Sequence, residues 1–414
     1  MRIDFLRAAI PLSGLRRGSD LLIWLICVGL FVQLSGIVYT NDGSRYSTQV
    51  YLLFFLPALV FAILNRYSFQ VLAHVDLFVF LLLLSWVFWV SFFYDDSVKS
   101  SFYWAKVLFL IALYVLVVSL LSSNLNSRLR SVLFCSLICV LFFAWATILH
   151  NFFVLNYRLD YDFLRVNRFY TLGWKGFADL DHPIIAGLYY GVFSIVALWF
   201  YLEGKLTAYK ILFFTFAMAG LLFYVLLTFS RGAWFSVGAA GLFLLLITNT
   251  RRSWILVILG SVSLLVIFFT FYTQLVNEHD IGVNGRDLIW NYYFSVLDNF
   301  WLWGAGAGTE FYFKFPNGFE VIHAHSLYLQ LWYEYGILGI SLFVALLLSL
   351  LWKGWQCREQ PIARLGLALL VFAMVAMISD VYAVFHRPSP YWVIFWFPVG
   401  ILLGVQRKPV ASLG

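Results

Sequence analysis

Arginine and histidine side chains in three short motifs are the residues of this sequence best suited to chemistry. Arg231 lies in a Ser-Arg-Gly motif, Arg286 in a Gly-Arg-Asp motif, and His323 and His325 in a His-Ala-His-Ser motif. A guanidinium stays protonated in proteins and matches phosphate oxygens with paired N–H groups, whereas an imidazole exchanges protons near neutral pH. These residue types therefore predict a site that binds an anion and transfers a proton.

Each arginine has a functional and a structural interpretation. Arg231 interrupts an apolar stretch in a tight hairpin, where it can contact phosphate or extend toward lipid headgroups. Residues 284–296 predict a helix with Asn284 as its N-cap and Asp287 answering it, so Arg286 falls in the first turn. Free backbone N–H groups beside a fixed cation favour an anion. The alternative is a surface arginine paired to a nearby carboxylate.

His325 is predicted to be a general base or a hydrogen-bond partner of the substrate, with His323 as a further substrate contact. A structural histidine is one alternative, and a metal pair is another, although no clear third ligand stands at helical spacing. Helical spacing also places Tyr328 and Trp332 on the same face as His325. This amphipathic run leads to Gly336, where a membrane span is predicted to begin.

Other polar groups are expected to complete the site. Asp380 lies near the end of an apolar run and is predicted to pair with an arginine, either Arg231 or Arg286. Arg168 is predicted to contact substrate from a separate loop. The Asp-Leu-Asp-His run at 179–182 resembles a metal-binding DxD motif, but such short matches arise often by chance, so we predict no metal.

The chain that must position these residues has the composition of a membrane protein. It has 414 residues, of which 63% are hydrophobic, 21% aromatic and 11% charged, whereas soluble domains average about 25% charged. This excludes a soluble enzyme, a disordered chain and a nucleic-acid module. The apolar runs are continuous rather than alternating, which favours an all-α bundle over a barrel. A single polytopic domain, 1–414, is predicted with spans at 21–39, 49–64, 70–93, 101–121, 132–155, 184–202, 211–229, 233–248, 254–272, 336–352, 365–382 and 391–405.

The distribution of charge predicts the orientation of these twelve spans. With both termini in the cytoplasm, 16 Lys and Arg fall on that side and 10 on the other, as the positive-inside rule requires. The outer side then carries two long loops, at 156–183 and 273–335, and the larger one is expected to contain amphipathic helices. Its glycine-rich segment 303–308 lacks the context of a nucleotide-binding loop and is predicted to be a flexible turn.

The ordered combination of motifs resembles the bacterial O-antigen ligases, a group whose superfamily also holds O-antigen polymerases and some protein O-oligosaccharyltransferases. The resemblance covers most of the chain and rests on about twelve spans, one large outer loop late in the chain, and matching residues at Ser230, Arg231, Gly232, Ala233, Trp234, Gly285, Arg286, Trp290, His325, Ser326, Leu329, Gln330, Glu334, Gly336 and Gly339.

This resemblance implies a GT-C-like, inverting glycosyltransferase of the bacterial inner membrane that needs no metal, ATP or other cofactor and works on the periplasmic face. The donor would be a glycan on undecaprenyl pyrophosphate. The acceptor would be a sugar hydroxyl of lipid A–core, so that the product completes lipopolysaccharide. By the same resemblance, Arg231 and Arg286 hold the pyrophosphate, His325 is the catalytic histidine, and Asp380 matches a functionally important acidic residue.

The sequence departs from the family pattern at one position, and it leaves alternative functions open. His182 precedes Pro183 where the family pattern has Asn or Asp, which leaves the role of that position unassigned. The acceptor groove is not exposed by sequence either, so an O-antigen polymerase or a protein O-oligosaccharyltransferase remains an alternative. A transporter of lipid-linked glycans is a further alternative, but it would place functional charges throughout the spans, and few lie there.

Overall fold

The computed structural model describes residues 19–65, 75–93, 99–205, 207–274, 276 and 285–406, and it confirms the predicted all-α class. Helices dominate because lipid offers no hydrogen-bond partners, so every backbone group in a span must bond within its own segment. The helices are α1 (Ser19–Tyr39), α2 (Gly43–Val50), η1 (Tyr51–Phe55), α3 (Leu56–Leu64), α4 (Val75–Phe93), α5 (Ser101–Asn124), α6 (Asn126–Leu149), η3 (His150–Val154), α7 (Tyr161–Val166), α8 (Pro183–Leu202), α9 (Ala208–Leu227), α10 (Arg231–Thr248), α11 (Arg251–Thr270), α13 (Arg286–Ser295), η4 (Leu297–Asn299), α14 (Leu327–Gln356), α15 (Pro361–Ser379), η5 (Trp392–Trp396) and α16 (Phe397–Gly404).

Eleven helices of the described residues are long and apolar enough to cross a membrane, and each overlaps one predicted span. The last predicted span, 391–405, is a shorter apolar helix, Trp392–Gly404. Residues 70–74 of the third predicted span lie outside the described residues. The positions of the spans are therefore those that the apolar runs predict.

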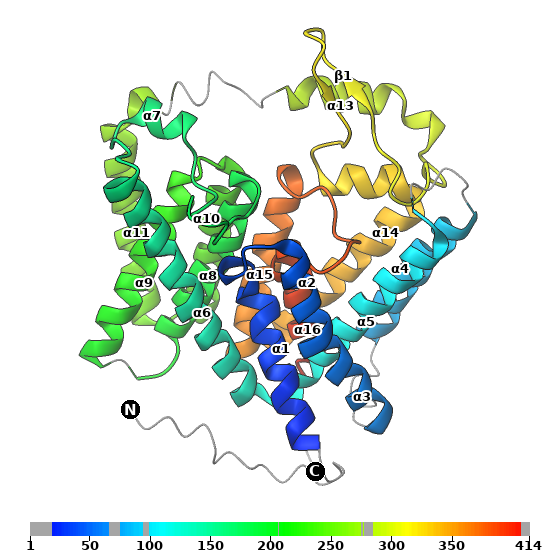
Figure 1. Ribbon diagram of the computed structural model, residues 1–414, viewed down its shortest axis with the longest axis horizontal. Coiled ribbons are helices and arrows are strands. Elements are labelled where there is room, and N and C mark those ends of the chain that lie inside the picture. The colour runs from blue at the N-terminus through cyan, green and yellow to red at the C-terminus, as the bar shows by residue number, and fades with distance from the viewer. Residues whose placement is uncertain are drawn as a thin grey trace.

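The two long loops lie at the same end of the helical bundle. In Figure 1, α7 of the first loop and α13 of the second lie at the upper ends of the long helices. A short hairpin belongs to the second loop, in which β1 (Phe313–Lys314) pairs antiparallel with β2 (Glu320–Val321). Because α10 begins at this end and α15 finishes there, their ends face the same loops.

The glycine-rich segment is an ordered turn, so the prediction of flexibility is wrong. The N–H of Ala305 donates to the carbonyl of Tyr333 at 2.6 Å, and the N–H of Gly306 donates to the carbonyl of Glu334 at 3.2 Å. A Cβ on Gly304 would collide with the backbone of α14, which explains why glycine is needed there. Hydrogen bonds from this segment therefore hold the second long loop against α14.

α14 joins the predicted amphipathic run and the tenth span in one bent helix. Gly336 adopts φ +65° inside it, a left-handed conformation that breaks the helical geometry. A side chain at Gly336 would meet the backbone at Leu302 and Trp303. The predicted start of the span is thus the position of the kink, and the first three turns of α14 belong to the site.

Candidate functional site

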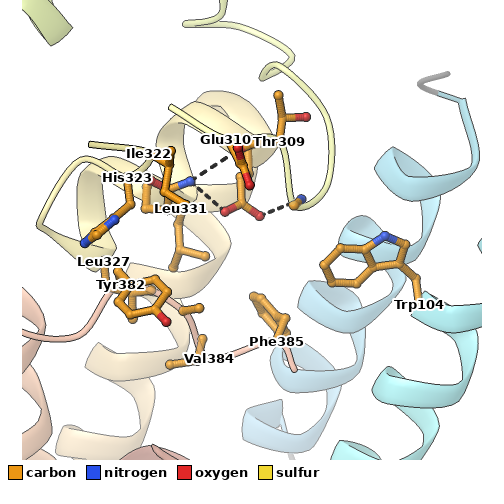
Figure 2. Close-up of a pocket in the computed structure, with 14 residues that line it drawn as sticks. Trp104, Thr309, Glu310, Ile322, His323, Leu327, Leu331, Tyr382, Val384 and Phe385 are labelled. Carbon is orange, nitrogen blue, oxygen red and sulfur yellow. Dashed lines mark hydrogen bonds between the residues drawn. The ribbon is translucent and has the colours of Figure 1, made fainter. Parts of the chain in front are cut away.

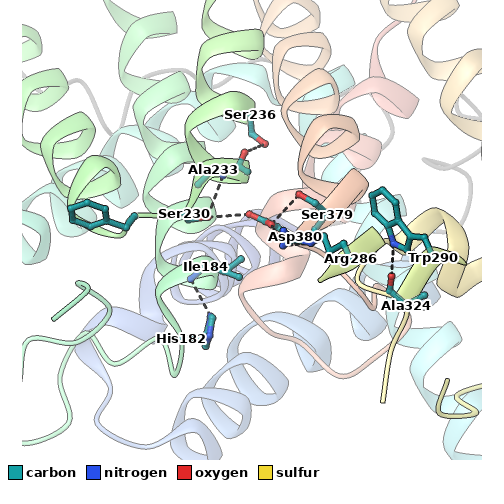
Figure 3. Close-up of polar contacts among 12 residues, drawn as sticks. His182, Ile184, Ser230, Ala233, Ser236, Arg286, Trp290, Ala324, Ser379 and Asp380 are labelled. Carbon is teal, nitrogen blue, oxygen red and sulfur yellow. Dashed lines mark hydrogen bonds and ion pairs between the residues drawn. The ribbon is translucent and has the colours of Figure 1, made fainter. Parts of the chain in front are cut away.

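Asp380 joins the elements that carry the two predicted arginines. It follows the last residue of α15, and its carboxylate is 4% exposed. Its Oδ1 accepts hydrogen bonds from Arg286 at 3.3 Å and from the Ser379 hydroxyl at 3.0 Å, and its Oδ2 accepts from the Ser230 hydroxyl at 3.0 Å (Figure 3). The structure therefore assigns Arg286 as a pairing partner of Asp380, a choice that the sequence left open.

The Ser-Arg-Gly motif has a separate task for each residue. Ser230 caps α10, because its hydroxyl accepts from the N–H of Ala233 at 3.3 Å. Gly232 lies so close to the carboxylate of Asp380 that a Cβ there would overlap it. Arg231 is thereby the first residue of a capped helix whose second position touches Asp380. The motif predicts the hairpin, and the structure adds the reason for glycine.

Arg286 is the first residue of α13 and is largely buried, with its side chain 16% exposed. The predicted cap Asn284 lies outside the described residues, and Gly285, at φ +74°, precedes the helix. Burial lowers the pKa of Arg286, Asp380 raises it, and the positive charge of Arg231 lowers it further. Since Arg231 acts electrostatically on Arg286, the two guanidiniums belong to one cationic site.

Three helices begin around this cationic site. α10 and α13 each begin at one of its arginines, and Gly187 in the first turns of α8 packs against Thr228 and Ser230 of the α9–α10 hairpin. The first N–H groups of a helix lack intrahelical acceptors, and the helix dipole makes that end positive. Helix ends and guanidiniums together favour a multiply charged anion.

The histidine motif is held rigidly by its central residue. Ala324 is fully buried, and its carbonyl accepts a hydrogen bond from Trp290 Nε1 at 3.0 Å (Figure 3). Its N–H donates to Gln330 Oε1 at 3.1 Å. His325 adopts φ +51°, an uncommon conformation for a side chain other than glycine. The hydrogen bonds of Ala324 hold the backbone of this strained turn, from which both imidazoles project.

A series of buried hydrogen bonds connects the histidine motif, through Gln330, to the glycine-rich turn. Gln330 Nε2 donates to Glu334 Oε1 at 2.9 Å, and Glu334 Oε2 accepts from the N–H of Gly308 at 2.9 Å (Figure 2). Buried polar networks that are satisfied at each member give one rigid arrangement. Sequence reasoning found Gln330 and Glu334 only as motif matches. In the sequence, only their spacing of four residues, which places them on one helix face, indicates that the two side chains interact.

His325 is a neutral base in this environment. Burial is the largest cause that lowers its pKa from the usual 6.5 to about 4, and the positive charges of His323 and Arg286 contribute to the same shift. Arg286 therefore lies within electrostatic range of His325, which joins the histidine to the cationic site. An anion bound at Arg286 would oppose that repulsion and raise the basicity of His325 when substrate is present.

His323 lies between His325 and a cavity. Its ring centroid is 4.1 Å from that of His325 and 4.6 Å from that of Tyr382. Burial lowers the pKa of His323. The cavity has a volume of about 320 Å³ and reaches from His323 to Trp104 of α5 (Figure 2). The prediction that His323 contacts substrate stays a prediction, now with a cavity beside it.

Arg168 and His182 support the elements of the site. Arg168 donates to the carbonyls of Thr228 at 2.6 Å and Phe229 at 3.2 Å, which follow the end of α9. His182 caps α8, because its Nδ1 accepts from the N–H of Ile184 at 3.2 Å. An imidazole thus performs the capping task of the expected Asn or Asp. Burial and the charge of Arg168 lower the pKa of His182. Substrate contact by Arg168 stays a prediction.

The DxD-like run forms a local turn. Asp179 Oδ1 accepts from the N–H of Asp181 at 3.0 Å, an arrangement typical of Asx turns. Across the described part of the chain, no three His, Cys, Asp or Glu side chains are grouped as metal ligands would be. The run is therefore the turn that leads into α8.

Two comparisons with known proteins point in the same direction as the geometry. The family model for O-antigen ligases matches residues 216–344, which contain Arg231, Arg286 and His325. The O-antigen ligase of Pseudomonas aeruginosa (strain PAO1) is 24% identical over 410 residues, covering 98% of this chain and 97% of that protein. The resemblance to O-antigen ligases is therefore confirmed, and it supports a ligase-type enzyme of the glycosyltransferase class in a multi-pass membrane protein.

Proposed function

We propose that this chain transfers an O-antigen glycan from undecaprenyl pyrophosphate to a sugar hydroxyl of lipid A–core on the periplasmic face of the inner membrane. The observation that carries the proposal is the buried ion pair of Arg286 with Asp380, with Arg231 and His325 each within electrostatic range of Arg286. Such a site binds a pyrophosphate and places a neutral base beside it. The similarity to a named ligase over nearly the whole chain supports the ligase over the polymerase and protein-transferring alternatives.

The reaction follows from the positions of these groups. The acceptor hydroxyl attacks the anomeric carbon, and its proton passes to His325. The bond between the anomeric carbon and the phosphate oxygen breaks with its electron pair on that oxygen. Arg231 and Arg286 stabilise the growing negative charge, since both guanidiniums are held before the substrate arrives. Attack on the face opposite the leaving group inverts the anomeric centre.

Asp380 positions Arg286, and its negative charge offsets the electrostatic repulsion between the two neighbouring guanidiniums. Its carboxylate also accepts from Ser230 at the start of α10, so one group ties the helices of both arginines together. Side chains of the protein supply the charge stabilisation and the base in these steps. The proposal therefore includes no metal ion, nucleotide or other cofactor.

Deletion of the gene tests the proposed acceptor. We expect lipid A–core without polymer, together with accumulated lipid-linked polymer, because transfer to core is the step removed. Electrophoresis of lipopolysaccharide and extraction of lipid-linked glycan measure both. Complementation with the wild-type gene should restore capped core. Core that carries a single repeat in the deletion strain would identify a polymerase instead, and unchanged lipopolysaccharide would contradict both.

A further inference from the structure

The cavity beside the histidine pair takes no part in the steps described above. Its lining comes from α5, from the segment that follows the glycine-rich turn, from the first turns of α14 and from residues 382–385. Figure 2 shows these segments facing one another around the open space. We propose that this cavity is the subsite for a neutral sugar unit of the acceptor glycan, an inference that rests on the proposed function.

The charges of the lining separate this cavity from the pyrophosphate site. Glu310 and Glu334 line it, and within the described residues its lining contains no Lys or Arg. The exposed carboxylate of Glu310 repels a pyrophosphate, whereas Arg286, paired with Asp380, and the nearby Arg231 form the cationic site. The leaving group and the contents of the cavity are therefore held apart by opposite local charge.

The two histidines mark the boundary between the two regions. Arg286 is among the causes that lower the pKa of His325, whereas burial is the cause that lowers the pKa of His323. His323 lines the cavity, and its ring lies 4.1 Å from that of His325. A sugar in the cavity thus lies against His323, whose ring is next to that of the catalytic base, and no arginine is among the residues that line it.

The lining has the chemistry that sugars require. Carboxylate oxygens accept hydrogen bonds from hydroxyl groups, and aromatic rings pack against the apolar faces of sugar rings. Trp104, Tyr382 and Phe385 supply the rings. Both carboxylate oxygens of Glu334 already bind Gln330 and Gly308, whereas the side chain of Glu310 is exposed. Glu310 is therefore the carboxylate placed to accept from a sugar hydroxyl, and Glu334 fixes the wall.

The direction of displacement also favours the acceptor over the donor. An inverting displacement needs the nucleophile on the face opposite the leaving group. Since the leaving pyrophosphate is held at Arg231 and Arg286, the attacking hydroxyl must reach the anomeric carbon from the face that points away from these arginines. A volume of about 320 Å³ lies at the small end of ligand pockets, which commonly hold about 300–1,000 Å³. It suits a terminal portion of a glycan rather than a whole polymer.

Steady-state kinetics of the Glu310→Ala variant tests this subsite. Lipid-linked glycan and lipid A–core, both purified from the deletion strain, serve as donor and acceptor, with each concentration varied at saturation of the other. We expect the KM for lipid A–core to rise about tenfold, because a hydrogen bond to a charged group is lost. The KM for the donor should stay within about twofold of wild type, and so should kcat. Asp298→Ala, an exposed carboxylate of the same loop outside the lining, is the matched control.

A second variant separates loss of the subsite from loss of folding. Tyr382 is 42% exposed, and Tyr382→Leu removes an aromatic wall; we expect it to raise the same acceptor KM with the donor KM unchanged. An unchanged acceptor KM in both variants, or a rise confined to the donor KM, would overturn the subsite while leaving the proposed function intact. If the wild-type protein does not transfer to lipid A–core at all, the proposed function itself fails.

Discussion

At the scale of single residues, the site depends on how one carboxylate arranges two guanidiniums. Asp380 accepts from Arg286 and from Ser230, and Gly232 leaves room for its carboxylate. Both contacts are charge-assisted, and such hydrogen bonds are stronger than neutral ones. His325 completes the group, since the charge of Arg286 helps to keep it neutral in the absence of substrate.

Replacing either arginine by lysine should not preserve activity. A lysine keeps the charge but loses the planar, paired donors that match a phosphate. We expect Arg231→Lys and Arg286→Lys each to lower kcat/KM by about tenfold, and the corresponding alanine variants by about a hundredfold or more. Initial rates with purified substrates measure this. Arg158→Ala, an exposed arginine of the other long loop, is the control. Wild-type rates in both lysine variants would show that charge alone is sufficient.

The pH dependence of kcat/KM should report the environment of His325. The reaction needs a neutral imidazole, so activity is complete above its pKa and falls as pH decreases through that value. Because the pKa is about 4 instead of 6.5, we expect the acid limb well below pH 6.5. Arg286→Gln should move this limb upward, since the positive charge of Arg286 lowers the pKa. A wild-type limb at pH 6.5 or higher would contradict this electrostatic account.

At the scale of elements, the helix ends position the chemistry. α10 and α13 begin at the two arginines, α15 ends at Asp380, and α14 begins just after His325. The glycine-rich turn and the kink at Gly336 hold α14 against the second long loop. Small residues are therefore required where one backbone or carboxylate approaches another.

A single methyl group at Gly232 should disturb this arrangement. Gly232→Ala places a Cβ where the carboxylate of Asp380 lies, so Asp380 must move away from Ser230 and Arg286. We expect a loss of transfer of at least tenfold and a loss of stability of about 1–3 kcal/mol, typical of overpacking. Initial rates and thermal unfolding in detergent measure these effects. Gly238→Ala is the control on the same helix, because nothing lies within 4 Å of its added Cβ. Equal behaviour of the two variants would show that the contact with Asp380 is unimportant.

At the scale of the whole molecule, the spans and the site differ in how far the sequence predicts them. Each span is a local apolar run, so its position is readable from composition alone. The pairing of Arg286 with Asp380 joins residues 94 positions apart, and the bond from Trp290 to Ala324 joins residues 34 apart. No local pattern encodes such contacts. The motifs therefore predict which side chains do chemistry, and the packing of the helices decides which of them meet.

Packing also explains why the turn at 303–308 is ordered, and it adds contacts of Arg168 that the motifs did not show. The turn at 303–308 looked flexible because glycine lacks local preference, yet its hydrogen bonds to α14 order it. Arg168 donates hydrogen bonds to two carbonyls just after the end of α9. In both cases the partner lies on an element distant in sequence.

Transfer by the purified protein tests the central claim most directly. Wild-type protein and the His325→Ala variant are mixed in detergent and EDTA with lipid-linked glycan and lipid A–core from the deletion strain, and the capped core is separated by electrophoresis. We expect capped core with wild type and none with His325→Ala, with both proteins equally folded by thermal unfolding. Equal amounts of capped core from both proteins, loss of product on chelation, or elongation of the lipid-linked glycan in place of capped core would contradict the account.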